Sequence, residues 1–551
     1  MRREVTWREA FFAGGGGALL AVVMTWPLVL HLGSDIGKDL GDPLLQAWQV
    51  AWIGHALLHA PLHLWQANTF WPYDDTLAFS DALIGYAPVG VLSQSSPHAA
   101  LVGYNLLFLF AYALAFLGAY LLAREIGIGW PGAIAAGAAF AYAPWRLAQN
   151  GHLHVLSSGG IPLAIFLLVR GYRRRSAPTV LAGWLVAAWQ MTLGFTLGLQ
   201  LAYLLLVLGV IAGVAFWRSW LPRPDRRVLV ASLLGIAAFV LVSGLMARPY
   251  LRVLDAHPEA RRSVEYVQTF SPRARSFLAG PVESHPWARV TARARASLEA
   301  PDEMALFPGL TISLLALAGV LGSVLPRRLR IGLAVGVVVC ALLSLGVRDV
   351  DGLHRYLTPY RFLFDFGPGW DGVRTPGRIN TLTSLGIALL AGAGLCVATG
   401  YLRARRGVRF GRLAAGALIA LVLFDGLGPI AHPRVPTPPA AVSVAPEPQL
   451  SLPAGFLDDL RYSYWSTAGF PLTVNGAGGF DPTGYDRLRH AVAGFPDEAS
   501  IAALEKAGIR SVVLYPGAAE GTTWERAASK PVAGLPVERE RVGDAIVFRL
   551  R

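Results

Sequence analysis

The amino-acid sequence predicts an all-α polytopic membrane protein of about eleven transmembrane helices, followed by a small α/β domain outside the cytoplasm. Three observations predict this fold class. The 551 residues are 54% hydrophobic and only 15% charged, whereas soluble domains average about a quarter charged residues. Apolar runs long enough to cross a bilayer, which takes roughly 20 residues, recur along the chain. Short Arg-rich connections alternate with long segments between these runs, as expected for a multi-pass protein.

Eleven apolar runs qualify as spans. They lie near residues 10–32, 100–123, 127–144, 155–171, 178–194, 196–217, 228–247, 304–325, 329–347, 380–401 and 412–431. The first run is too long for the apolar core of a cleavable signal peptide, so we expect it to be a retained anchor. Only Gly194 and Phe195 separate the fifth run from the sixth. These two runs therefore form either two spans or one re-entrant hairpin.

The basic residues orient the chain in an inner or plasma membrane. Arg2, Arg3 and Arg8 place the N-terminus in the cytoplasm, and the short basic connections near 124, 173–175, 223–227, 327–330 and 403–409 then also fall inside. The long segments 33–99, 248–303, 348–379 and 433–551 fall outside. The outside loop 248–303 is itself Arg-rich. It serves either an anionic ligand or anionic lipid head groups, which are the membrane partners we expect.

The domain organisation follows from a change of pattern at His432. Residues 1–432 form the membrane domain, 433–454 a Pro-rich linker and 455–551 a soluble α/β domain. Within this domain we predict a strand at 471–474, helices at 482–493 and 497–507, a buried strand at 510–515 and a hairpin of 537–541 with 545–550. The net charge of +13 is explained by membrane orientation, so no nucleic-acid partner is expected. Cys340 and Cys396 lie in apolar spans, which excludes a disulfide framework.

Ionisable residues are nearly absent from the spans, with Asp425 the main exception. Ion-coupled transporters keep several such groups near the membrane midplane, so the pattern argues against that class. The polar residues gather instead in the outside loops. Asp35, Asp39 and Asp42 precede an amphipathic helix in the first loop. Asp42 is suited to cap that helix, with Pro43 at its first position, and also to act as a general base.

His55 and His59 share one face of the same helix, but no third ligand is evident, so we assign no metal site. Three arginines lie at the predicted outer boundary of the spans, namely Arg146, Arg374 and Arg378, and His152 lies in the same outer loop as Arg146. Arg is the side chain best suited to grip a phosphate with two parallel hydrogen bonds. Arginines at this boundary also serve as plain interface anchors.

Together these loops resemble the GT-C glycosyltransferases, and more specifically the bacterial polytopic membrane proteins assigned to that superfamily. The resembling stretches are GDPLLQAW, ANTFWPYDDTLAFSD, APWRLAQNGHLH, RPYL, ALFPGL and VRTPGRIN, with VNGAGGFDP and LEKAGIRSVVLYP near the C-terminus. The likeness runs through nearly the whole chain, although each motif is short. This sequence has Asp81 where the family pattern often has Glu, and His154 where Gln is common.

The resemblance implies transfer of a sugar, a hexose or a pentose, from a polyprenyl-phosphate donor to an envelope glycan, lipid or protein acceptor outside the cytoplasm. Such a reaction needs a base for the acceptor hydroxyl and cations for the departing phosphate. By resemblance the base is Asp42, with Asp39 and Asp35 as alternates, and the phosphate cations are Arg146, His152, Arg374, Arg378 and Arg248. Asp81 and Asn105 are expected to support the acceptor or a neighbouring side chain. No cofactor is assigned with certainty, and a divalent cation is compatible with the reaction.

Three other functions compete with this interpretation. One is a lipid or solute transporter, against which the uncharged spans and the lack of an internal repeat both argue. Another is a non-catalytic scaffold whose outer domain binds a partner or a cell-wall glycan. The third is a catalytically inactive relative. The sequence alone leaves the sugar, the carrier and the acceptor undefined.

Overall fold

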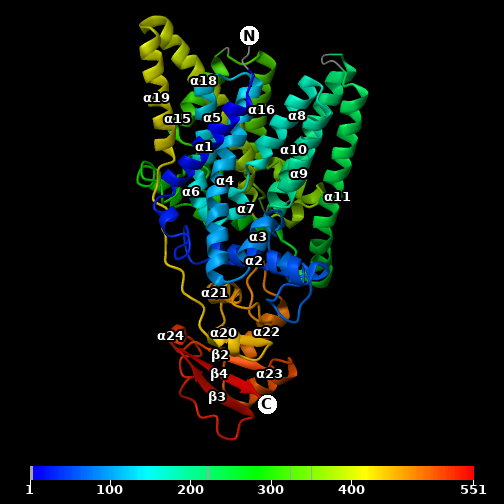
Figure 1. Cartoon of the computed structure of the whole chain (residues 1–551), viewed down its shortest axis with the longest axis vertical. Helices are drawn as coiled ribbons and strands as arrows, with labels where there is room; N and C mark the ends of the chain where they lie inside the picture. Colours follow the sequence, from blue (N-terminus) through cyan, green and yellow to red (C-terminus); the bar gives the residue numbers. More distant parts are fainter. Residues whose placement is uncertain (1–3, 220–222, 323, 349, 351) are drawn as a thin grey trace. The chain divides into compact units, whose positions relative to one another are not determined.

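The computed structural model describes residues 4–219, 223–322, 324–348, 350 and 352–551 (Figure 1). The chain is mostly helical, with one small sheet near the C-terminus. It forms two compact units, each built from segments that are distant in the sequence. The first unit comprises Met1–Val29, Phe108–Met246 and Arg262–Ile430, and the second comprises Leu30–Leu107, Ala247–Arg261 and Ala431–Arg551. Arg2 and Arg3, used above to orient the N-terminus, lie outside the described residues.

Each of the eleven predicted apolar runs contains a helix. These helices are α1 (Trp7–Met24), α4 (Pro97–Ile126), α5 (Trp130–Tyr142), α8 (Gly160–Arg174), α9 (Ala177–Met191), α10 (Phe195–Trp217), α11 (Arg226–Ala256), α15 (Leu310–Leu321), α16 (Arg327–Leu343), α18 (Asn380–Arg406) and α19 (Val408–Asp425). The fifth and sixth runs form two separate helices, α9 and α10, joined by a turn at 192–194.

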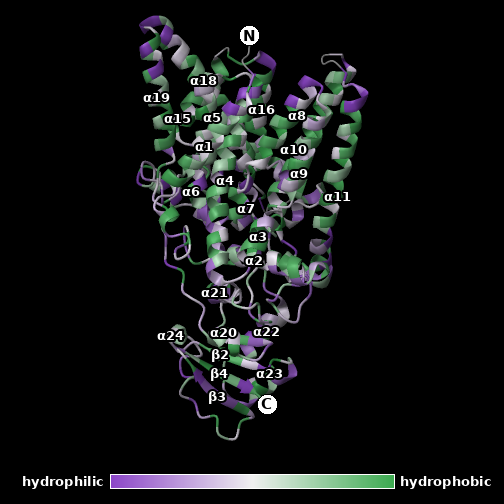
Figure 2. Cartoon of the chain, viewed as in Figure 1, coloured by the Kyte–Doolittle hydropathy of each residue, from purple (hydrophilic) through white to green (hydrophobic). Residues whose placement is uncertain are grey.

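Five helical segments of the described chain are long and apolar enough to cross a membrane. They are Pro97–Ile126, Leu153–Arg174, Phe195–Trp217, Arg226–Ala256 and Pro376–Arg406. The chain is therefore a membrane protein, and the total of eleven spans stays a prediction. Helices α10 and α11 are largely hydrophobic (Figure 2). Many of their apolar side chains are exposed, including Leu206, Val210 and Leu233. Such continuous apolar faces suit a hydrocarbon environment rather than water.

Close helix packing in the first unit depends on glycine. Helices α15, α5 and α16 all pack against α18. A Cβ atom at Gly394 of α18 would lie 1.8 Å from the carbonyl oxygen of Leu315 in α15, and one at Gly132 of α5 would lie 2.2 Å from the carbonyl oxygen of Gly392. Larger residues cannot fit there unless the backbones move apart. Small residues at such contacts are characteristic of helices that pack within a membrane.

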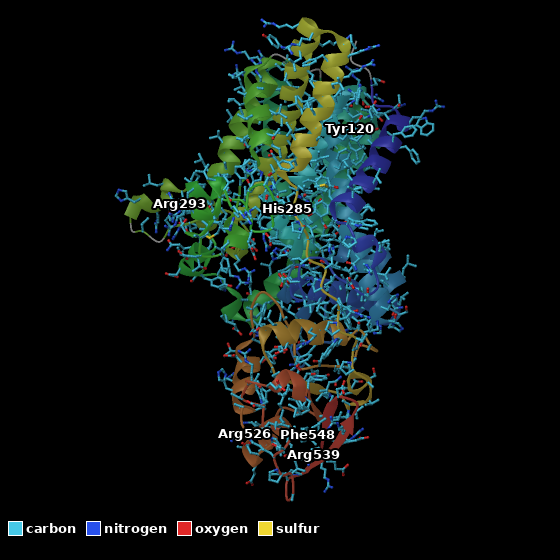
Figure 3. All side chains as sticks on the ribbon, turned by 90° about the vertical axis from the view of Figure 1, so that its left-hand side faces the viewer. Tyr120, His285, Arg293, Arg526, Arg539 and Phe548 are labelled. Carbon is cyan, nitrogen blue, oxygen red and sulfur yellow. The ribbon has the colours of Figure 1, made fainter. Side chains whose placement is uncertain are left out.

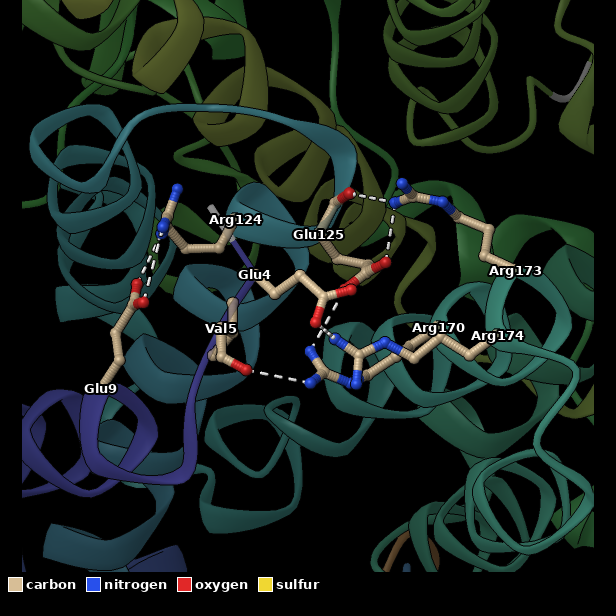
Figure 4. Close-up of polar contacts among 8 residues, drawn as sticks. All are labelled: Glu4, Val5, Glu9, Arg124, Glu125, Arg170, Arg173 and Arg174. Carbon is tan, nitrogen blue, oxygen red and sulfur yellow. Dashed lines mark hydrogen bonds and ion pairs between the residues drawn. The ribbon is translucent and has the colours of Figure 1, made fainter. Parts of the chain in front are cut away.

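The N-terminal segment is fastened to the ends of α4 and α8 by ion pairs (Figure 4). Glu9 pairs with Arg124 at 2.5 Å, Glu4 with Arg174 at 2.8 Å, and Glu125 with Arg170 at 3.3 Å and Arg173 at 2.7 Å. The hydroxyl of Tyr120 also donates to Glu9 at 2.8 Å. Each of these guanidinium groups therefore has a carboxylate partner from a neighbouring element.

Short elements connect the long helices of the first unit. They include α6 (Trp145–Ala148), η5 (Gln149–Gly151), α7 (Leu153–Leu156), α12 (Val264–Thr269), η7 (Ala274–Leu278), α13 (Ala292–Arg295), α14 (Pro301–Met304), α17 (Tyr360–Phe366), η9 (Trp370–Gly372) and η10 (Pro376–Ile379).

Asp425, the main ionisable residue of the predicted spans, has a structural role in the first unit. Its Oδ2 accepts the backbone N–H of Ile312 at 3.0 Å, so it stabilises the N-terminal turn of α15.

The second unit contains α2 (Asp42–His59), α3 (Ala87–Ser93), α20 (Ala441–Val444), α21 (Phe456–Trp465), α22 (Thr483–Ala491), α23 (Glu498–Lys506) and α24 (Pro516–Ala519). Its strands are β1 (Gln449–Leu452), β2 (Ser511–Leu514), β3 (Val537–Val542) and β4 (Ala545–Leu550), in the order β1-β2-β4-β3. Only β1 and β2 are parallel. The β3–β4 pair places Arg539 opposite Phe548 (Figure 3), and Phe548 is fully buried.

The predicted helices, the buried strand and the hairpin of the C-terminal region are all present. The strand predicted at 471–474 is wrong, because residue Thr473 makes only one isolated bridge, with Gln449. Strand β1 lies instead inside the Pro-rich stretch, between Pro448 and Pro453. The hydrophobic core of the sheet also includes Phe70 and Phe79 of the first loop. The C-terminal region and the first loop therefore share one core.

Candidate functional site

Asp35, Asp39 and Asp42 lie in the second unit, on the loop that leads into α2. The loop is held to the chain after α19, because the N–H of Lys38 donates to the carbonyl of Ala431 at 2.8 Å and Asp35 forms a bridge with Arg434. Asp39 is exposed, and its Oδ1 accepts the N–H of Gly41 at 2.9 Å. Asp42 is half-buried. It is the first residue of α2, and Gly41 rather than Asp42 occupies the cap position.

Asn105 lies against this loop. Its side chain is fully buried, and its amide nitrogen donates to the carbonyls of Leu32 and Asp35, both at 2.8 Å. The nearby His98 ring contacts the carbonyl of Gly33 at 3.1 Å. These contacts fix the backbone just before the aspartates. Asn105 therefore positions the loop, a supporting arrangement for the carboxylates that follow.

Asp81 and Arg248, also in the second unit, have different surroundings. Tyr250 of α11 holds the backbone on both sides of Asp81, because its hydroxyl donates to the carbonyl of Ser80 at 3.1 Å and accepts the N–H of Ala82 at 2.9 Å. Asp81 is half-buried, and Arg248 is exposed on α11. Arg248 therefore presents its charge at the surface of the unit.

Sequence reasoning missed Asp75, a buried carboxylate of the same unit. It accepts two hydrogen bonds from Arg252, at 2.7 Å from Nε and 2.6 Å from Nη2. The backbone of Asp75 is left-handed, with φ of 54°, and its N–H donates to the side chain of Gln66 at 2.6 Å. This two-pronged pair ties the first loop to the end of α11. The partners are 177 residues apart, so no local pattern could have revealed the pair.

In the first unit, Arg378 lies at the centre of a buried cluster. Two of its nitrogens donate to Glu303, Nε at 3.2 Å and Nη2 at 2.5 Å, and the third contacts Nε2 of His154 at 2.9 Å. Nε2 of His152 lies 3.7 Å from Glu303. Burial opposes ionisation of Glu303, but the Arg378 charge outweighs it and holds the pKa of this carboxyl far below its ordinary value. Sequence reasoning missed Glu303 as well.

Two further contacts complete the cluster. The side chain of Gln149 donates to the carbonyl of Asp302 at 2.7 Å, which joins η5 to α14. Arg374 is half-buried, with its guanidinium 5.0 Å from the centre of the Phe270 ring. Its charge also helps to lower the pKa of Glu303. Among the described residues Arg374 has no hydrogen-bond or ion-pair partner. The cluster thus combines one carboxylate, two arginines and two histidines.

Arg146 lies in the interior of the first unit. It is only 1% exposed, and it donates to the hydroxyl of Ser158 at 3.0 Å and to the carbonyl of Leu156 at 2.9 Å. It therefore contacts a different set of groups from Arg378.

The structure brings some predicted site residues together and separates others. Within the first unit, Arg378 and His152 both contact Glu303, and the charge of Arg374 acts on Glu303 without a direct contact. Within the second unit, Asn105 contacts the loop of Asp35. Elsewhere in that unit the rings of His55 and His59 stack at 4.4 Å, and the described residues contain no group of three or more metal-ligating side chains.

The comparisons with known proteins concern the fold. No protein-family model matches the sequence, and no curated protein matches it. The structure is similar to that of the arabinofuranosyltransferase AftD from mycobacteria, determined in two classes of one mutant. The TM-scores are 0.61 and 0.60 at 14% and 15% identity, and the likeness covers 99% and 100% of this chain. The chain spans 42% of the length of AftD.

A second likeness is weaker. The archaeal oligosaccharyltransferase AglB from Archaeoglobus fulgidus, in complex with an inhibitory peptide and a dolichol-phosphate, matches with a TM-score of 0.47 and 14% identity over 95% of this chain and 71% of that one. The AftD likeness extends over both compact units. The chain therefore has a fold similar to that of this arabinofuranosyltransferase.

Proposed function

We propose that this chain is an integral membrane glycosyltransferase that moves a sugar from a polyprenyl-phosphate donor to an acceptor outside the cytoplasm. The observation that carries the proposal is the likeness of fold to an arabinofuranosyltransferase over 99% of the chain. The buried cationic cluster around Glu303 and the aspartates at the start of α2 support it, because they supply the two kinds of group that the reaction needs. The proposed location is the inner or plasma membrane, with the N-terminus in the cytoplasm.

In the proposed reaction, Asp42 takes the proton from the acceptor hydroxyl as its oxygen attacks the anomeric carbon of the donor sugar. The bond between that carbon and the phosphate oxygen breaks, and its electron pair leaves with the phosphate. Phosphate departs readily as an anion, so no second carboxylic acid is needed, unlike in glycoside hydrolysis. Asp39 and Asp35 are alternates for the base, and Asp81 and Asn105 are supporting residues.

The cations proposed for the departing phosphate are Arg374, Arg378 and His152, with Arg146 and Arg248 as further candidates. Arg374 is favoured because none of the described residues neutralises it, so its charge is available to an anionic substrate. Arg378 is oriented by its two hydrogen bonds to Glu303. A guanidinium that is already oriented loses less freedom when it binds a phosphate.

The test of this proposal is transfer of radiolabelled sugar from polyprenyl-phosphate donors to isolated membranes, comparing the wild type with Asp42→Asn. We expect transfer to fall by about 10²–10⁴-fold, the usual contribution of a general base. Asp74→Asn is the matched control, because Asp74 is an exposed carboxylate of the same loop. Equal thermal stability of the three proteins would establish that the variants fold.

Full transfer by Asp42→Asn would reject Asp42 as the base and move the test to Asp39→Asn and Asp35→Asn. Equal loss in Asp74→Asn would contradict a specific role for Asp42. If the wild type transfers no sugar from hexose or pentose donors, the proposed activity itself is contradicted, and the scaffold and transporter hypotheses gain support.

A further inference from the structure

Arg146 carries a buried charge that no described residue neutralises. It is 1% exposed, and its hydrogen bonds go to uncharged oxygens of Ser158 and Leu156. No carboxylate of the described chain lies within ion-pair distance of it. Removing a charged group from water is unfavourable unless an opposite charge or a full set of hydrogen bonds compensates. Arg146 therefore needs a counter-charge that the described residues do not supply.

Aromatic rings supply only part of the compensation. The guanidinium carbon lies 5.7 Å from the ring centres of Tyr112 and Phe140 and 6.0 Å from that of Trp145. Each such contact attracts the cation less strongly than a buried ion pair would. The rings attract the cation but carry no net charge. They also leave its hydrogen-bonding capacity unfilled, because Nε of Arg146 has no partner among the described residues.

A second unused donor lies close by. The hydroxyl of Tyr142 is buried and has no hydrogen-bond partner in the described part of the chain. The rings of Tyr142 and Tyr112 stack at 5.2 Å, but the Tyr112 hydroxyl is already engaged with Asn150. The Nε–H of Arg146 and the hydroxyl of Tyr142 are thus two neighbouring donors that have no acceptor among the described residues.

These two residues line one pocket of the first unit. Its other walls come mainly from apolar groups, namely Met24, Ala143, Leu147 and Ile430, together with Thr25, Tyr112 and Gly426. The hydroxyl of Thr25 donates to the carbonyl of Ala21 at 2.7 Å, so it is already satisfied. The pocket has space for about one water-sized group, which is too little for a tetrahedral phosphate with its lipid.

We propose that this pocket binds one small monovalent anion of halide size, held by the Nε–H of Arg146 and the hydroxyl of Tyr142. A water molecule could accept the same hydrogen bonds, but it would leave the charge of Arg146 without a counter-ion. The proposal goes beyond the proposed transferase activity and does not depend on it. It also assigns Arg146 to this small anion rather than to the donor phosphate, for which Arg146 was a further candidate.

The anion has a structural consequence for a neighbouring segment. Arg146 holds the backbone at Leu156 and the side chain of Ser158, and Tyr112 holds Asn150. The segment between these points carries His152 and His154 of the Glu303 cluster. A halide bound at Arg146 therefore keeps this segment in place without contacting the cluster itself.

The experiment is thermal unfolding of the full-length protein in detergent across a chloride series, with gluconate holding the ionic strength constant. We expect the unfolding midpoint of the wild type to rise with the logarithm of chloride concentration, as a ligand that binds only the folded state requires. Bromide should substitute for chloride, and its anomalous scattering would place the ion beside Arg146. Tyr142→Phe should weaken halide binding about tenfold, because one hydrogen bond to the ion is lost.

Two variants complete the test. Tyr120→Phe is the matched control, because its hydroxyl donates to Glu9 and should leave the halide response unchanged. Arg146→Lys keeps the charge but loses the Nε–H, so its halide response should weaken. A wild-type unfolding midpoint that does not change with chloride or bromide concentration would overturn the proposal and leave water as the occupant. Stabilisation by inorganic phosphate but not by halide would also overturn it, and would assign the pocket to a phosphate group.

Discussion

Two groups of arginines in the first unit differ in what neutralises them. At the ends of α4 and α8, Arg124, Arg170, Arg173 and Arg174 each lie within 3.3 Å of a glutamate oxygen (Figure 4). In the described chain, Arg146 and Arg374 have no carboxylate partner at all. The first group holds the N-terminal segment to α4 and α8 and joins these two helices to each other. The second group retains charge for an anion, which is the property that a phosphate-binding or halide-binding site requires.

Arg378 is intermediate in character between these two groups. It has a carboxylate partner, but both side chains of the pair are buried. Both side chains of the Arg378–Glu303 pair are less than 10% exposed, whereas Glu9 is 23% exposed in its pair with Arg124. A buried pair is costly to break from one side, since the remaining charge stays out of water. The Arg378–Glu303 and Arg124–Glu9 pairs therefore differ in burial although they carry the same charges.

The largest effect is expected from Glu303→Gln. The substitution leaves the buried Arg378 without its counter-charge, so we expect a loss of about 3–5 kcal/mol in the free energy of unfolding. Glu9→Gln at the more exposed pair should cost about 1 kcal/mol or less. Denaturant unfolding in detergent measures both. Equal losses in the two variants would contradict the distinction by burial.

A pH experiment sharpens the same comparison with a buried carboxyl that lacks an arginine partner. Asp459 of α21 is 1% exposed and accepts hydrogen bonds from Tyr485 at 2.6 Å and from Asn475 at 2.8 Å. Burial raises the pKa of Asp459 from 3.8 to about 7. A raised pKa means that the folded state binds the proton more tightly than the unfolded state. Protonation of Asp459 therefore stabilises the folded state fully below about pH 4, and this stabilisation is lost as the pH rises through 7.

We therefore expect wild-type stability to contain a component that falls between about pH 4 and 7, of up to about 4 kcal/mol, since one pKa unit corresponds to about 1.4 kcal/mol. Asp459→Asn should remove this component. Glu303 behaves in the opposite way, because its lowered pKa gives stability that is present above about pH 4.5 and lost only in stronger acid. An unchanged pH profile in Asp459→Asn would contradict the assignment.

Arg374→Gln tests the arginines that lack a carboxylate. Since no described ion pair is broken, stability should change little, whereas binding of polyprenyl phosphate should weaken about 10–100-fold, as expected when a charge-assisted hydrogen bond is lost. Binding of the labelled lipid to the purified protein measures this change without requiring transfer. Unaltered affinity would remove Arg374 from the proposed phosphate site.

The smallest effect is expected from Arg173→Gln, the matched control for Arg374→Gln. Arg173 is 49% exposed and pairs with Glu125, which Arg170 also contacts. We expect about 0.5 kcal/mol of stability to be lost and lipid binding to be unchanged. A loss of binding equal to that of Arg374→Gln would show that total positive charge, rather than a specific site, governs the affinity.

Local patterns predicted much of the fold. Apolar runs place helices correctly, because hydropathy over about 20 residues acts within a single segment. The hairpin around Gly543 was also predictable from its turn residues, and Gly543 has a φ of 60°. Strand β1 was missed because Pro448 and Pro453 mark irregular structure, and only pairing with the distant β2 reveals the strand.

The candidate site was less predictable, because its contacts are long-range. Arg378 was singled out from its own motif, but Glu303 lies 75 residues earlier in the chain and carries no local signal of its role. The same holds for Asp75, whose partner Arg252 is 177 residues away. Asp42 was placed at a helix start to within one position, since Gly41 takes the cap. Residue types indicated the chemistry, and only the fold shows which charges are already paired.

The measurement that tests the central claim most directly follows a doubly labelled donor, with tritium in the sugar and phosphorus-32 in the polyprenyl phosphate. Wild-type protein is incubated with this donor and acceptor membranes, and the two labels are then separated by extraction. A transferase predicts that tritium moves to the acceptor while phosphorus-32 remains with the polyprenyl lipid, in equal molar amounts. Labels that stay together on an intact donor, even one moved across the bilayer, would contradict the account and favour a lipid transporter.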